Sequence, residues 1–147
     1  MLNKGQKLLD VHHVMRYVPW AKLRRDGDNN VIGFLGAAFE LRDGEEHLSV
    51  NWLEYFQGGH ANQIEECVKE FRSNLDVKPK GAFGLACVKS VKDVCQGTGR
   101  PIRIIYSPSP NNLSHASIQK LPRNEFSLFE SLANDAFNEI ILNSQIT

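Results

Sequence analysis

The sequence has no long hydrophobic run, because no stretch approaches the about 18 consecutive apolar residues that a membrane-spanning helix requires. It also has no excess of charge of either sign, with 17 basic and 17 acidic residues among its 147. This balance excludes a protein that is basic throughout and one with a long acidic tail. We therefore expect no membrane association, and any electrostatic recognition must come from a local group of charges.

Cysteine is scarce as well. Cys67, Cys87 and Cys95 are an odd number, and their spacing is typical neither of a disulfide framework nor of a zinc site. The first residues mix charged and apolar side chains and lack the continuous apolar stretch of a signal peptide. These features predict a reducing, cytoplasmic location, and they give no indication of a metal or a cofactor.

The sequence does contain enough apolar residues for one folded domain. Leu, Ile, Val and Phe together make up 42 of the 147 residues, a share above that of disordered chains. No Gly/Ser-rich or Pro-rich linker divides the chain. We expect residues 1–147 to form a single globular domain with its own hydrophobic core.

Hydrophobic periodicity predicts two main helices. Over about 63–74, apolar residues recur at helical spacing, and Asn62 and Glu65 before and within this stretch have the spacing of a capping box. A broad apolar stripe predicts the longest helix over about 125–142. The second helix is expected to close over a sheet.

β-Branched and apolar runs bounded by turn residues predict the strands. These runs are 11–18, 36–42, 47–50, 82–88, 102–106 and 115–118. Asp43-Gly44 indicates a hairpin between the second and third runs, and nearby prolines place 115–118 at a sheet edge. Because strands and helices do not alternate regularly, we predict an α+β fold. Its mixed or largely antiparallel sheet has about five strands, covered by the two main helices.

The neutral total conceals a division of charge along the chain. Residues 77–123 carry eight basic residues against one acidic residue, whereas residues 40–76 carry a net charge of −6. The candidate ligand-binding residues of the basic segment are Lys78, Lys80, Lys89, Lys92, Arg100 and Arg103. On one shared face they would attract an acidic protein partner or a phosphate-bearing ligand, such as a nucleotide or nucleic acid. Alternatively, the acidic helices neutralise them within the domain.

Histidines suggest a second kind of site. His12 and His13 are adjacent in the first predicted strand, so their side chains point to opposite faces, with Arg16 on the side of His12. The candidate catalytic residues are His13, His115 and Arg16, as general base, general acid and stabilising cation. Metal-independent RNA cleavage by attack of a 2′-hydroxyl is one reaction such a set could perform. The alternative is that each histidine is hydrogen-bonded within the sheet.

A third group lies around the aromatic segment 52–56. Ser49, Asn51 and Glu54 could present a hydroxyl, an amide and a carboxylate to a polar ligand, or Asn51 and Glu54 could cap a short helix. If the segment is exposed, it is a candidate protein–protein interaction surface.

The sequence favours a small binding or accessory module. A His/Arg enzyme acting on RNA or a nucleotide and an aromatic interaction module are the alternatives, and homo-oligomerisation stays open.

Overall fold

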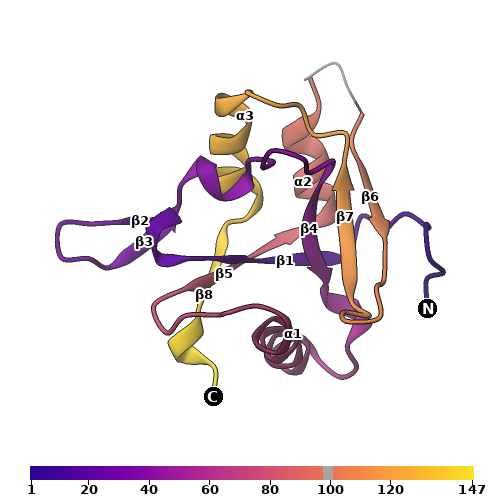
Figure 1. Ribbon diagram of the computed structural model, residues 1–147, viewed down its shortest axis with the longest axis horizontal. Helices are drawn as coiled ribbons and strands as arrows, with labels where there is room; N and C mark the ends of the chain where they lie inside the picture. The colour runs from indigo at the N-terminus through magenta and orange to yellow at the C-terminus, as the bar shows by residue number, and fades with distance from the viewer. Residues whose placement is uncertain (98–100) are drawn as a thin grey trace.

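The computed structural model describes residues 1–97 and 101–147, and within them six antiparallel strands form the main sheet (Figure 1). They are β1 (His13–Val18), β4 (His47–Trp52), β5 (Ala82–Cys87), β6 (Arg103–Tyr106), β7 (His115–Gln119) and β8 (Glu139–Leu142). Their order is β6-β7-β4-β1-β5-β8, which places β4 and β1 in the middle. The predicted α+β class is confirmed, with one strand more than expected in an antiparallel sheet.

Helices cover both faces of this sheet (Figure 1). They are α1 (His60–Asn74), α2 (Val88–Cys95) and α3 (Phe126–Ser131). α1 lies on one face, where Met15 of β1 and Phe83 of β5 pack with Cys67 and Phe71. α2 and α3 lie on the opposite face. No helix within residues 1–97 and 101–147 is long and apolar enough to cross a membrane.

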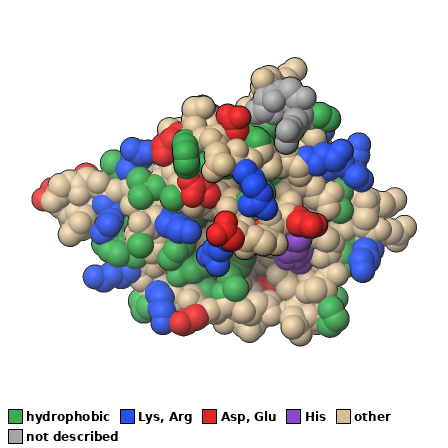
Figure 2. Space-filling view, turned by 45° about the horizontal axis from the view of Figure 1, so that its top comes forward, with side chains coloured by type: hydrophobic (Ala, Val, Ile, Leu, Met, Phe, Trp, Pro, Cys, Tyr) green, Lys and Arg blue, Asp and Glu red, His purple; other side chains and the backbone are tan. Residues whose placement is uncertain are grey.

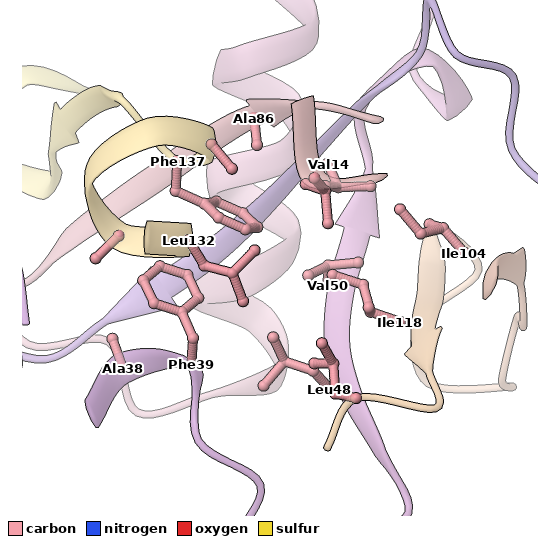
Figure 3. Close-up of a cluster of buried hydrophobic side chains, with 14 of the residues drawn as sticks. Val14, Ala38, Phe39, Leu48, Val50, Ala86, Ile104, Ile118, Leu132 and Phe137 are labelled. Carbon is pink, nitrogen blue, oxygen red and sulfur yellow. The ribbon is translucent and has the colours of Figure 1, made fainter. Parts of the chain in front are cut away.

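The larger part of the core lies between the sheet and α3. Val14, Val50 and Ile118 project from three neighbouring strands toward Phe39 and Phe137 (Figure 3). The rings of Phe39 and Phe137 pack with their centroids 4.6 Å apart. Because side chains alternate along a strand, Val14 of β1 packs in this cluster and the next residue, Met15, packs on the α1 side.

A small second sheet, which the sequence analysis did not predict, consists of β2 (Leu23–Arg25) and β3 (Val31–Phe34). Its turn is held by Asp26, whose Oδ1 accepts hydrogen bonds from the main-chain N–H groups of Asp28 and Asn30, both at 2.9 Å. This hairpin extends to one side of the main sheet (Figure 1).

The helix predicted over about 63–74 is confirmed, and it begins earlier, at His60. Asn62 does not cap it, because the N-cap position is Gly59 and Asn62 lies within the first turn, where its Nδ2 donates to the main-chain oxygen of Gln57 at 2.8 Å. The strands predicted over 11–18, 82–88 and 102–106 correspond to β1, β5 and β6.

The helix predicted over about 125–142 is wrong in its second half. After α3 the chain makes a π-helical turn, Leu132–Ala136, and leaves helical geometry at Phe137 (φ −88°, ψ 61°). Ile140 and Ile141 then pair with β5 as part of β8. Two adjacent β-branched residues fit a strand as well as a helical stripe, and the free edge of β5 decides between them.

Two further strand predictions are corrected. Residues 36–42 do not form a hairpin strand, since Gly36–Phe39 is a 3₁₀ helix, η2. A Cβ at Gly36 would lie 2.8 Å from Glu130 Oε1, so the chain packs here too closely on α3 for a regular strand. β7 is not an edge strand, because it lies between β6 and β4. Likewise the predicted capped helix after Asn51 is the end of β4 followed by one 3₁₀ turn, η3 (Leu53–Tyr55).

Candidate functional site

The pairing of β1 with β4 ends early, and Arg16 occupies the gap. The two strands pair only at Val14–Trp52 and Met15–Asn51, although both continue beyond these positions. In place of further pairing, Arg16 Nε donates to the main-chain oxygen of Ala38 at 2.8 Å, and its Nη1 donates to that of Ser49 at 2.7 Å. The guanidinium group is therefore fixed between two central strands.

A cleft of about 610 Å³ opens at this gap. Its walls come from β1, β4, the C-terminal end of α1 and the loops before β4 and β7. Tyr17 and Phe71 form apolar parts of the wall, while Ser49, Asn51 and His115 form a neutral polar part. Two carboxylates, Glu45 and Asp76, also line it. The cleft is thus concave and partly apolar and carries a few polar groups, which is typical of sites that bind small molecules.

Three basic side chains, Arg16, Lys22 and Arg42, line the cleft. None of them forms an ion pair with a carboxylate of residues 1–97 or 101–147 within 4.0 Å. Burial lowers the pKa of Arg16 to about 10, an effect that Glu45 partly offsets. Burial also lowers the pKa of Lys22, the charges of Arg42 and Arg16 lower it further, and those of Glu40 and Glu45 oppose this. The cations are thus close enough to repel one another.

Two asparagines form a fixed amide pair in the polar part of the cleft. Asn112 Oδ1 accepts hydrogen bonds from the N–H and the hydroxyl of Ser114, so its Nδ2 is directed at Asn51 Oδ1, 2.8 Å away. Asn51 is buried, and within the described chain its Nδ2 has no hydrogen bond. Burial raises the pKa of the Cys67 thiol, and the neighbouring Asn51 amide partly offsets this effect.

His115 contacts Ser107 of the loop after β6, since its Nδ1 lies 2.9 Å from both the main-chain oxygen and the Oγ of Ser107. When the Ser107 hydroxyl donates to Ser117 Oγ, 2.6 Å away, Nδ1–H donates to the carbonyl oxygen and Nε2 is the unprotonated nitrogen. Burial lowers the pKa of His115, the Ser107 carbonyl opposes this, and the charge of His47 adds to the lowering. The ring is therefore neutral near pH 7, with an unprotonated Nε2 that can accept a proton.

The structure brings two of the three predicted catalytic residues into this cleft, Arg16 and His115, but not His13. His13 Nδ1 lies 2.6 Å from Glu54 Oε2, and its ring packs against His60 of α1. It lines a separate hollow of about 160 Å³. The reason is local: the 3₁₀ turn of Glu54 and the first turn of α1 enclose the start of β1.

The predicted ligand-binding lysines are not gathered at the cleft. Lys78 and Lys80 precede β5, whereas Lys89 and Lys92 follow it in α2. Most have partners: Lys78 with Asp76 at 2.6 Å, Lys89 with Asp93 at 2.8 Å, Lys92 with Asp10 at 2.7 Å, and Lys80 over the Trp20 ring at 5.3 Å. On the face in Figure 2, Lys and Arg side chains are spread among other residues. Arg103 is exposed on β6, and Arg100 lies outside the described residues.

The sequence analysis did not indicate Lys22 and Arg42, which line the cleft, or His47, whose ring contacts that of His115, and Ser49 and Asn51 fitted both ligand binding and a structural role. A signal for the polar face was present. Polar residues alternate in His47-x-Ser49-x-Asn51 and in His115-x-Ser117-x-Gln119, and these two runs are paired residue by residue in β4 and β7. Glu54, in contrast, binds His13 and is not part of the cleft.

Comparison with known proteins does not assign this cleft to a family. No protein-family model, curated protein or solved structure matches the chain. The proposals below therefore depend on the residues of the cleft alone.

Proposed function

We propose that the cleft binds a small phosphate-bearing ligand, with Arg16, Lys22 and Arg42 holding the phosphate. The observation that carries this proposal is that three cations line one cleft and none lies within 4.0 Å of a carboxylate of the described residues. Glu45 and Asp76 also line the cleft, so three basic side chains face two acidic ones. A buried positive charge that does not contact a counter-ion is costly, and an anionic ligand would supply that contact. The planar guanidinium group is well suited to phosphate oxygens.

The dimensions and the neutral part of the cleft favour a nucleotide over inorganic phosphate. A volume of about 610 Å³ falls within the range of small-molecule sites. The amide pair and His115 offer hydrogen bonds away from the cations, and the Tyr17 and Phe71 rings offer apolar surface. A ligand with a phosphate at one end and a polar ring system at the other uses both parts.

The other functions considered from the sequence have less support. An acidic protein partner would have to displace the carboxylates that already pair with Lys78, Lys89 and Lys92. An interaction surface on residues 52–56 would lack Trp52, which is 3 % exposed. A cytoplasmic location, in keeping with the small odd number of cysteines, accompanies the proposal of a nucleotide ligand.

Isothermal titration calorimetry with adenosine 5′-monophosphate and with inorganic phosphate tests the proposal. We expect one saturable site per chain, tighter for the nucleotide. Arg16→Gln should weaken binding at least about tenfold, in keeping with the loss of a hydrogen bond to a charged group. Because Arg16 also binds two main-chain oxygens, Lys22→Gln and Arg42→Gln test the same cations without removing those hydrogen bonds.

Lys89→Gln is the matched control, since it removes one positive charge that already has a carboxylate partner outside the cleft. It should leave both dissociation constants unchanged. Absence of binding to the wild-type protein at millimolar concentrations of both probes would overturn the proposal. So would equal losses in the Lys22 and Lys89 variants, because binding would then follow net charge and not the cleft.

A further inference from the structure

The rings of His47 and His115 face each other on the polar surface of β4 and β7. Their centroids lie 5.9 Å apart, with 76° between the ring planes. The strand register places the pair Ser49–Ser117 between these two histidines on the same face of the sheet. Two titratable groups of the same type thus share a surface that opens into the proposed phosphate-binding cleft through His115.

The two imidazoles are not equivalent. Nε2 of His115 has no hydrogen bond with any residue the structure describes, and it is the basic atom when Nδ1 donates to the Ser107 carbonyl. The ring of His47 has no such main-chain contact among those residues. Two positive charges this close repel each other, which disfavours the state in which both rings are charged. A general base and a general acid require one ring of such a pair to be neutral and the other to be protonated.

Arg16 lies beside this pair. Its Nη1 is hydrogen-bonded to the main-chain oxygen of Ser49, which belongs to the strand position between the two rings. Arg16 and His115 line the same cleft. A phosphodiester group bound in the cleft would therefore share it with His115, and His47 lies in ring contact with His115 just outside the lining.

We propose that His115, His47 and Arg16 cleave a ribonucleotide phosphodiester of single-stranded RNA by transesterification, a proposal that rests on phosphate binding in the cleft. His115 Nε2 takes the proton of the 2′-hydroxyl, whose oxygen forms a bond to phosphorus. The P–O5′ bond breaks, and protonated His47 gives its proton to the leaving O5′. Arg16 stabilises the negative charge that develops on the phosphoryl oxygens. The products are a 2′,3′-cyclic phosphate and a 5′-hydroxyl.

The pair returns to its starting state in a second step. Water attacks the cyclic phosphate while neutral His47 accepts the proton of the water. Protonated His115 then gives its proton to the departing 2′-oxygen, which leaves a 3′-phosphate. Every atom in both steps comes from the substrate, water and these side chains. The substrate must be RNA, because its 2′-hydroxyl is the nucleophile and the deoxy backbone lacks it.

Incubation of the purified protein with a single-stranded RNA hexamer and with the DNA hexamer of the same sequence tests this inference. We expect fragments of the RNA that end in a 2′,3′-cyclic phosphate, identified by mass spectrometry, and intact DNA. His115→Gln and His47→Gln should each lower the cleavage rate by about 100-fold or more, the usual contribution of a general acid or base. The Kd for adenosine 5′-monophosphate should change by less than about threefold in the His47 variant.

The His47→Gln and His115→Gln preparations control for a contaminating nuclease, because a contaminant would cleave RNA equally in every preparation, and Lys89→Gln shows that loss of a charge outside the cleft leaves the rate unchanged. Intact RNA after incubation with wild-type protein that binds adenosine 5′-monophosphate would overturn the catalytic inference and leave the binding proposal in place. Absence of both activities would overturn both. Equal cleavage by the wild-type and His47 proteins would also overturn the inference, even if the His115 variant did not fold.

Discussion

Arg16 of β1 and Ser49 of β4 are joined by a hydrogen bond from Nη1 to the main-chain oxygen, 2.7 Å long, beyond the last residue pair of the β1–β4 ladder. The Arg16 side chain therefore replaces a main-chain hydrogen bond between the two strands. The same guanidinium lines the cleft and satisfies the oxygen of Ala38. One residue therefore contributes both to the stability of the sheet and to the charge of the proposed site.

We predict that Arg16→Met lowers the free energy of unfolding by about 1–3 kcal/mol, because it leaves two main-chain oxygens without their donor. Arg16→Lys should recover only part of this loss, since one ammonium group does not reproduce the fork of two donating nitrogens. Urea denaturation followed by circular dichroism measures both. Lys89→Gln, at an exposed ion pair, should leave the free energy of unfolding unchanged. An Arg16→Met protein as stable as this control would contradict the structural role.

Phe129 and Phe126 of α3 offer a matched pair for the core. Phe129 is 2 % exposed and Phe126 is 63 % exposed. We expect Phe129→Ala to lower the free energy of unfolding by about 3–5 kcal/mol, because a large buried side chain leaves a cavity. Phe126→Ala should cost less than about 0.5 kcal/mol. Chemical denaturation of both variants measures the difference, and similar values for the two would mean that α3 does not close the core in this orientation.

The parts of the fold that the sequence could predict are those whose local pattern and packing agree. Apolar residues of α1 recur at helical spacing, and the same residues are buried against the sheet. β8 could not be predicted in this way, because Ile140 and Ile141 fit a helical stripe and become a strand only next to β5. Residues 36–39 are similar: their geometry depends on close packing against Glu130, a contact distant in sequence.

In the candidate site, too, local features could be predicted from the sequence, whereas contacts between distant residues could not. That Arg16 belongs to a strand and that His12 and His13 face opposite sides followed from alternation alone. That Arg16 and His115 share a cleft depends on the order of strands, which no local pattern specifies. His13 was grouped with them by residue type, and the structure places it with Glu54 and His60 instead.

Acidification should destabilise the protein through two histidines. Burial lowers the pKa of His12 and of His115 below the ordinary value of 6.5, so the folded state binds fewer protons than the unfolded state. The free energy of unfolding must then fall as the pH drops from about 7.5 to about 5.5. His115→Gln should reduce this slope, and a His12→Gln/His115→Gln double variant should reduce it further. Denaturant titrations at several pH values measure the slope, and an unchanged slope in the double variant would refute this origin.

The three cations of the cleft should oppose folding in the absence of ligand. Burial lowers the pKa of Lys22, the charges of Arg42 and Arg16 lower it further, and Glu40 and Glu45 oppose them, so the neighbouring cations make a charged Lys22 less favourable. For a lysine whose folded pKa is lowered, the charged form is destabilised at neutral pH, and removal of a neighbouring charge relieves that cost. We expect Arg42→Gln to raise the stability of the ligand-free protein by about 0.5 kcal/mol at low salt.

The same Arg42→Gln variant should bind adenosine 5′-monophosphate more weakly than wild type, and its affinity should decline less when the salt is raised from about 0.05 to about 0.2 M, because one fewer charge is screened. Thermal unfolding without ligand and calorimetry with it measure the two effects on one preparation. If the cations repel one another and together bind an anion, Arg42→Gln must raise the stability of the protein and lower its affinity for the anion. A variant that loses both would show that Arg42 stabilises the fold and does not select a ligand.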